Sequence, residues 1–210
     1  MPLSPLPPVI PLFPLGDVVL FPRVPLPLHI FEPRYRKMVA DALAGSRVIG
    51  MILLRPGWES DYEGRPPVFD AGCAGVIEQW EELPDGRYNI VLKGLSRFRV
   101  RQEYTGEPYR VASVEALEDA PGTPEALESA RQQVLELVAR AAQTPVMVVA
   151  RPDLSPEVFV NALCQSLDLE PLERQALLDT DGVQARFERL AAILEFRALE
   201  RSSGGPVGTH

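Results

Sequence analysis

The spacing of hydrophobic residues changes character near residue 120. Before that point the apolar runs are short and turn residues separate them, which is typical of β-strands. After it, apolar residues recur every three or four positions, which is typical of amphipathic helices. The pattern predicts an α+β protein with a β-rich part over residues 1–118, an α-helical subdomain over 119–201 and a disordered Gly/Ser tail over 202–210.

The β-rich part contains several separate strand signals. Residues 48–54 form a continuous apolar run, which predicts a strand buried on both faces. Residues 76–82 and 87–93 flank Leu83-Pro84-Asp85-Gly86, whose residue types favour a hairpin turn. Further strands are expected at residues 97–101 and 109–117, with short pieces broken by proline over 9–21.

One helix interrupts these strands. Pro33 suits the first helical position, and Gly45 is a plausible stop. Between them an apolar face is formed by Tyr35, Met38, Val39, Ala42 and Leu43. Residues 55–70 are polar and rich in glycine and proline, so we expect a long loop there. Several short strands and one helix predict a small, partly closed antiparallel β-barrel.

The second half of the chain contains several sequence signals for the start of a helix. Thr123-Pro124-Glu125 and Ser155-Pro156-Glu157 both combine an N-cap residue, a proline and an acidic first turn. Pro171 begins a shorter helix, and a longer one follows from about Val183. The subdomain should therefore contain four helices.

The net charge and the composition limit the classes of partner that the chain is expected to bind. The net charge is −8, and residues 1–118 carry 13 basic and 15 acidic groups, so most of the excess lies in the helical part. Such an acidic chain is a poor candidate for binding nucleic acid or anionic membranes. The 22 prolines include six in the first 14 residues, which argues against a signal peptide. We expect a cytoplasmic protein with Cys73 and Cys164 as buried, reduced thiols.

Searches for catalytic motifs fail. The sequence contains no phosphate-binding loop of the G-x-x-x-x-G-K-[ST] type, and His29 and His210 are its two imidazoles, so we expect no metal and no cofactor. A Cys73–His29 pair is conceivable as a hydrolase nucleophile and base, but nothing in the local sequence supports it. The chain is therefore not expected to be an enzyme.

Two groups of residues are candidates for binding. Arg97, Arg99 and Arg101 alternate along one predicted strand, which would place them on one sheet face, either to bind an anion or RNA or to pair with acidic neighbours in solvent. Three aromatic residues form the other group, and two of them lie in polar loop sequence. They are Trp58, Tyr62 and Trp80, which could bind apolar polypeptide or fold back over one end of the barrel.

A resemblance to a known family rests on several motifs in order. Residues 11–22 (PLFPLGDVVLFP) and 26–36 (LPLHIFEPRYR) resemble the opening of the Lon protease N-terminal, substrate-binding domain. The later motifs that fit are residues 72–77, 93–99, 173–179 and 186–190. The resemblance covers residues 9–200 and implies a PUA-like β-barrel followed by an α-helical subdomain.

The resemblance also implies a function. In Lon this domain precedes an ATPase domain and a Ser–Lys protease domain, and the sequence stops after the helical part, so we expect neither activity. We therefore expect a non-catalytic module that binds unfolded or apolar polypeptide, with a protease or chaperone component as a further candidate partner. The alternatives are an RNA-binding PUA-like domain that uses the Arg97/Arg99/Arg101 stripe, and a hydrolase.

Overall fold

The computed structural model describes residues 6–61, 64–120, 122–141 and 153–203. The chain divides into two compact units. The barrel unit comprises Met1–Glu118 and Asp168–Asp179, and the helical unit comprises Asp119–Leu167 and Thr180–His210. Residues 168–179, which the sequence pattern assigns to the helical part, thus belong to the barrel unit.

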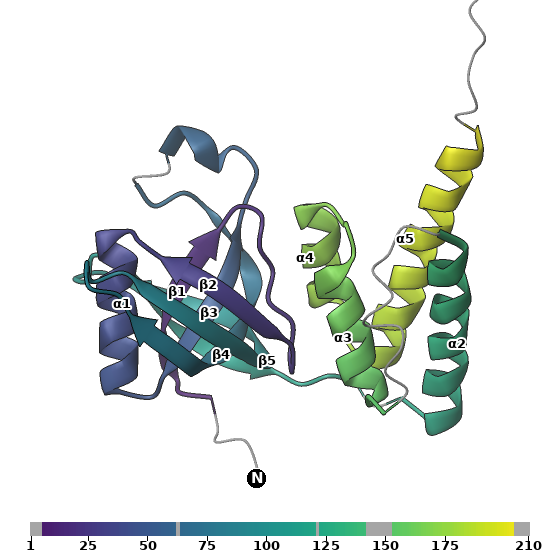
Figure 1. The fold of residues 1–210 in the computed structure, drawn as a ribbon, viewed down its shortest axis with the longest axis horizontal. Coiled ribbons are helices and arrows are strands. Elements are labelled where there is room, and N and C mark those ends of the chain that lie inside the picture. Colours follow the sequence, from purple (N-terminus) through teal and green to yellow (C-terminus); the bar gives the residue numbers. More distant parts are fainter. Residues whose placement is uncertain (1–5, 62–63, 121, 142–152, 204–210) are drawn as a thin grey trace, which may run out of the picture. The chain divides into compact units, whose positions relative to one another are not determined.

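Six strands of the described residues form one sheet in the barrel unit (Figure 1). They are β1 (Val9–Leu15), β2 (Pro25–Ile30), β3 (Val48–Leu54), β4 (Val68–Glu82), β5 (Tyr88–Tyr104) and β6 (Arg110–Leu117). Their order is β2-β5-β4-β3-β1-β6, and a further pairing between β5 and β6 closes the sheet into a barrel. β5 makes this possible because its 17 residues pair with β2 through the first half and with β6 through the second.

The sheet is mixed, whereas the sequence pattern predicts an antiparallel one. β1 and β3 run parallel, with Leu12 opposite Gly50, and the other pairings are antiparallel. A parallel pair requires a long crossover connection. Here the crossover contains β2 and α1 (Pro33–Ala44). The expected α+β class and barrel are confirmed, with this one parallel pairing added.

The barrel interior closes around Phe98. The buried core cluster consists of Ile10, Leu12, Val48, Ile52, Ala74, Phe98 and Ala112. Gly72 lies against the Phe98 ring, because a Cβ at this position would fall 2.7 Å from a ring carbon and 2.3 Å from the Met51 carbonyl oxygen. Every residue of β3 is buried, as its apolar run predicts.

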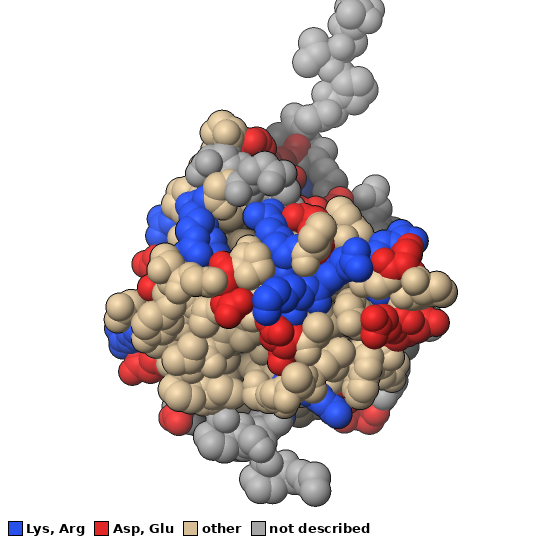
Figure 2. Space-filling model, turned by 90° about the vertical axis from the view of Figure 1, so that its left-hand side faces the viewer, with Lys and Arg blue, Asp and Glu red and all other residues tan. Residues whose placement is uncertain are grey.

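α1 begins and ends as its sequence indicates. Pro33 occupies its first turn, Gly45 is the C-cap residue, and the buried face contains Tyr35, Met38, Val39 and Ala42. On its exposed side Lys37 and Asp41 form an ion pair of 2.5 Å. The molecular face that carries α1 has basic and acidic side chains interspersed (Figure 2).

Two strand regions differ from the sequence expectation. β2 forms where no strand was expected, and β4 begins at Val68, inside the predicted loop. Pro25 and Pro27 obscure the β2 signal, yet an edge strand tolerates proline because only one of its sides needs N–H donors. β2 pairs with β5 alone among the described strands.

α4 (Pro171–Asp179) packs on the barrel. The Gln175 Nε2 atom donates to the Ala71 carbonyl oxygen of β4 at 3.1 Å. The Arg97 Nη1 atom of β5 donates to the carbonyl oxygen of Leu178 in the last turn of α4, at 3.2 Å. These buried bonds satisfy polar groups that would otherwise be costly to bury, and they explain why this helix belongs to the barrel unit.

The helical unit contains α2 (Pro124–Ala141), α3 (Pro156–Ser166) and α5 (Val183–Ser203). Both predicted N-caps form, since the Thr123 and Ser155 hydroxyl oxygens accept from the backbone N–H groups of Ala126 and Val158. α2 packs along α5, and α3 contacts both. The rings of Phe159 and Phe187 stack in the core with centroids 6.2 Å apart. Among the described helices, none is long and apolar enough to cross a membrane.

Candidate functional site

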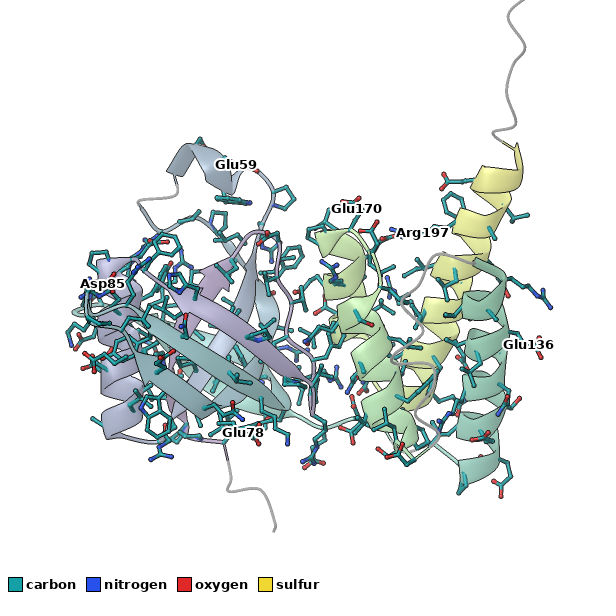
Figure 3. All side chains as sticks on the ribbon, viewed as in Figure 1. Glu59, Glu78, Asp85, Glu136, Glu170 and Arg197 are labelled. Atoms are coloured by element: carbon teal, nitrogen blue, oxygen red, sulfur yellow. The ribbon has the colours of Figure 1, made fainter. Side chains whose placement is uncertain are left out.

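A groove of about 520 Å³ opens on the barrel unit between β2, β5 and β4. Its lining consists of Pro27, Leu28, His29, Gln79, Trp80, Glu81, Asn89, Ile90 and Val91. Strand register aligns these residues in cross-strand rows, because Ile90 pairs with Leu28 on one side and with Trp80 on the other. The groove lies on the hairpin formed by β4 and β5. Figure 3 labels Glu78 on β4 and Asp85 in the turn between the two strands.

Trp80 is the largest of the residues that line this groove, and it is 45% exposed. The Arg47 guanidinium carbon lies 4.7 Å from the centroid of its ring, a cation–π contact. The backbone of Arg47 is itself held in place, since its N–H donates to Ala42 and its carbonyl oxygen accepts from Ile77. A fixed cation therefore supports an indole that stays open to solvent.

A polar ladder crosses the same three strands in the next cross-strand row, that of His29, Asn89 and Glu81, whose side chains lie on the opposite sheet face from the row of Leu28, Ile90 and Trp80. The Asn89 side-chain oxygen lies 2.8 Å from His29 Nδ1, and its Nδ2 donates to Glu81 at 3.1 Å. Arg87 Nη1 lies 3.3 Å from His29 Nε2. An amide oxygen accepts and a guanidinium donates, so His29 takes part in the ladder through both of its ring nitrogens. The ladder gives the groove a polar rim.

The outer edge of β2 is poorly suited to pairing with another strand. In an antiparallel ladder, residue pairs alternate between those that exchange two backbone hydrogen bonds and those that exchange none. Pro25 and Pro27 have no N–H, so they occupy the second kind of position and direct only carbonyl oxygens to the outer edge. A ligand at this groove therefore has to be recognised mainly through side chains.

The structure separates the three aromatic candidates. Trp80 lines the groove. Trp58, in a short 3₁₀ helix over Trp58–Asp61, is half-buried, and its ring lies so close to Gly16 that a Cβ there would fall 2.4 Å from Trp58 Cζ2. This packing resembles the covering role considered from the sequence. Tyr62 lies outside the described residues.

The arginine stripe is distributed over three environments. Arg97 is 3% exposed and donates to the carbonyl oxygens of Leu178 and Glu118 at 3.2 Å. Arg101 forms an ion pair with Glu115, next to a bulge in the β5–β6 pairing, and Arg99 is exposed. A buried guanidinium cannot contact a phosphate backbone, so two of the three arginines remain accessible to an anion.

The residues considered for catalysis are not assembled. Cys73 and Cys164 are both buried, and burial raises the pKa of the Cys164 thiol to about 12. His29 is held by Asn89 and Arg87. In the described part of the chain, no group of three or more His, Cys, Asp or Glu side chains could hold a metal ion.

Sequence reasoning did not identify most of the groove residues. Pro27, Leu28, Ile90 and Val91 are ordinary apolar residues, and only the pairing of β2 with β5 brings them beside Trp80. A sequence signal was available, because the aliphatic residues Leu26, Leu28 and Ile30 recur at every second position, as in a strand. Pro25 and Pro27 in this segment argued against a strand, so none was expected there.

A mixed barrel that carries an open apolar groove, together with a helical unit, defines an α+β architecture of two compact units. Residues 9–195 match the family model of the ATP-dependent protease La (LON) substrate-binding domain. The chain therefore belongs to the Lon substrate-binding domain family, as the sequence motifs predict.

Individual relatives agree with this assignment. The chain is 31% identical over 206 residues to a Lon protease of Roseiflexus castenholzii, an alignment that covers 93% of this chain and 25% of that protein. A Lon protease of Dictyoglomus thermophilum is 27% identical over 201 residues, again with 25% of that protein covered. The chain thus spans about a quarter of the length of the curated relatives it matches.

Solved structures show the same fold. The crystal structure of a Lon N-terminal domain protein from Xanthomonas campestris matches with a TM-score of 0.63 and 26% identity, covering 88% of this chain and 97% of that one. The N-terminal domain of the Mycobacterium avium complex Lon protease matches with a TM-score of 0.68, covering 89% and 98% of the two chains. At 18% identity, the second likeness concerns the fold alone.

Proposed function

We propose that this chain is a non-catalytic module that binds unfolded or apolar polypeptide segments, and that the groove around Trp80 is where they bind. Membership of a substrate-binding domain family supports the ligand class. The observation that carries the site is that Trp80, an aromatic residue 45% exposed, is among the residues that line an apolar groove. A protease or chaperone component is the partner class that such a module implies.

The chemistry of the groove suits an extended peptide. Pro27, Leu28 and Val91 offer apolar surface in the groove, and the Asn89 ladder offers hydrogen-bonding groups for the peptide main chain. Burying the exposed part of an indole stabilises a complex by about 2 kcal/mol, at roughly 25 cal/mol per Å². This is enough to make one side chain dominate a weak interface.

The central experiment is fluorescence anisotropy with labelled apolar peptides and a chemically denatured protein. Trp80→Ala should weaken binding about tenfold or more. Tyr104→Ala is a matched control, since Tyr104 is an aromatic residue of the same unit with similar exposure and does not line the groove. Binding weaker than about 100 μM for all probes, or an equal loss in both variants, contradicts the proposal.

Trp58→Ala tests the remaining sequence candidate. We expect it to reduce peptide affinity less than Trp80→Ala, because the Trp58 ring already packs against Gly16. A larger loss would move the binding surface to the segment that contains Trp58.

The non-catalytic part of the proposal needs its own assay. The chain should hydrolyse neither ATP nor a broad panel of peptide and ester substrates. Activity that disappears in a Cys73→Ala variant would support the hydrolase alternative and contradict the proposal.

A further inference from the structure

A second cavity of the barrel unit, of about 310 Å³, has a different character from the groove. Three arginines from separate segments line it: Arg34 in the first turn of α1, Arg65 before β4, and Arg110 at the start of β6. The walls include Tyr35 and Tyr109. No residue is shared between the linings of this cavity and of the groove.

Arg110 forms the buried base of this arginine pocket. Its side chain is 8% exposed, its Nη1 donates to Glu103 Oε1 at 3.3 Å, and its Nη2 donates to the Pro66 carbonyl oxygen. Burial lowers the pKa of the Arg110 guanidinium, Glu103 opposes this shift, and the positive charges of Arg65 and Arg34 add to it. Arg110 therefore experiences the field of both other arginines.

The other two arginines lie closer to solvent. Arg65 shares the Glu103 carboxylate with Arg110, at 3.9 Å. Arg34 pairs with Glu32 at 2.9 Å and stacks 4.6 Å above the centroid of the Tyr35 ring. These contacts hold each guanidinium in a defined orientation, as a preorganised anion site requires.

The charge of the lining favours a singly charged anion. In the lining itself three arginines face one acidic residue, Glu107, which also pairs with Lys37 at 3.4 Å, while Glu32 and Glu103 pair with the arginines from outside the lining. A guanidinium has five N–H donors in a planar fork, so arginines that already hold one internal carboxylate can bind another. Glu107 on the wall and Glu103 behind it would repel a dianion more strongly than a monoanion.

We propose that the arginine pocket binds the carboxylate of a polypeptide, either an acidic side chain or a C-terminal carboxylate. The volume suits one side chain, the tyrosine rings cover its carbon atoms, and the arginines hold its charged end. Such a site extends recognition beyond apolar segments to peptides with an acidic anchor. It does not require the groove around Trp80, because free carboxylates should bind the pocket by themselves.

Small capped amino acids test this directly by isothermal titration calorimetry or NMR titration of the intact chain. The probes are N-acetylglycine for a C-terminal carboxylate, acetyl- and amide-capped glutamate for a side chain, capped glutamine as a neutral control, and inorganic phosphate. We expect at least one carboxylate probe to bind with a Kd of about 1 mM or tighter. Capped glutamine should not bind.

Substitutions locate the binding. Arg34→Gln and Arg65→Gln should each weaken the binding of the carboxylate probes at least fivefold. Arg110 is not a useful position for substitution, because its side chain is buried. Arg55→Gln is the matched control, because Arg55 is an exposed arginine of the same unit that pairs with Asp70 at 3.1 Å and does not line the pocket. Circular dichroism confirms that each variant is folded, and the two pocket variants provide independent tests.

Four results would overturn the proposal. They are no saturable carboxylate binding up to about 50 mM, equal binding of capped glutamine, tighter binding of phosphate than of either carboxylate, and equal weakening by Arg55→Gln. None of these depends on Trp80. Loss of peptide binding in Trp80→Ala with carboxylate binding intact would thus separate the two sites.

Discussion

The Arg186 guanidinium holds both carboxylate oxygens of Asp119 in the helical unit, at 2.9 Å and 3.3 Å. Arg186 lies on α5, is completely buried, and also donates to the Asn161 side-chain oxygen of α3 at 2.9 Å. One buried cation therefore joins α5 and α3 to the segment before α2. Such a pair costs desolvation to form, and removing one partner leaves the other charge exposed to an apolar interior.

We expect Asp119→Ala to reduce the free energy of unfolding of the helical unit by about 3 kcal/mol, because the Arg186 charge stays buried without its carboxylate. Urea denaturation followed by circular dichroism measures this. Arg140→Ala is the control, since Arg140 and Glu136 form an exposed pair on α2 and its loss should cost less than about 0.5 kcal/mol. Similar losses in both variants would contradict the buried-pair assignment.

A second prediction concerns the arginine stripe. Arg97→Ala should destabilise the barrel unit by about 2–4 kcal/mol, because it leaves the buried carbonyl oxygen of Leu178, and also that of Glu118, without this donor. Arg99→Ala, one pleat away and exposed, should change stability by less than about 0.5 kcal/mol. Thermal unfolding of the two variants compares them. If Arg97→Ala is neutral while RNA affinity falls, the stripe is a binding surface.

The sequence predicted those elements in which local signals agree with tertiary demands. α1 begins at Pro33 and ends before Gly45, and residues 48–54 form a fully buried strand. In both elements the periodicity, the end signals and the burial favour the same structure. The β2 strand was missed because its prolines are tolerated only at an edge, and no local signal says which strand lies at an edge. The parallel pairing of β1 and β3 likewise depends on topology alone.

The candidate sites were predictable to a smaller extent. Trp80 was named as a candidate because a large aromatic side chain stands out in any sequence; it lines the groove, and its role in binding stays a prediction. Arg97 was expected to share an exposed sheet face, but α4 covers it, and a period of two cannot show what packs on a strand. The arginines at 34, 65 and 110 are far apart in the chain, so only the fold reveals their common cavity.

A third prediction tests the close approach of β5 to the segment before β2. A Cβ at Gly94 would fall 2.0 Å from the Phe21 carbonyl oxygen, so backbone would have to move to accept a side chain. Gly94→Ala should therefore cost at least about 2 kcal/mol of stability. Gly45→Ala is the matched control, since a Cβ there would make its nearest contact at 3.6 Å. Chemical denaturation of both variants should show a large loss for Gly94 and a small change for Gly45.

The last prediction concerns acid stability. The hydrogen bond from Lys37 Nζ lowers the pKa of Asp41, and a second bond from the Tyr109 hydroxyl at 2.7 Å lowers it further. Since the folded pKa lies below the unfolded value of about 3.9, ionised Asp41 stabilises the fold above that value, and this contribution disappears as the pH falls through the folded pKa. Asp41 is partly exposed, so the contribution should be below about 1 kcal/mol.

In urea titrations from pH 7 to pH 2, Asp41→Asn should lose stability relative to the parent chain near neutrality, and this difference should shrink below about pH 3. Tyr109→Phe removes one of the two donors and so brings the folded pKa of Asp41 closer to its unfolded value; its loss of stability with acid should therefore be smaller than in the parent chain and complete at a higher pH. A difference between Asp41→Asn and the parent that stays constant across this range would show that Asp41 acts through packing and not through its charge.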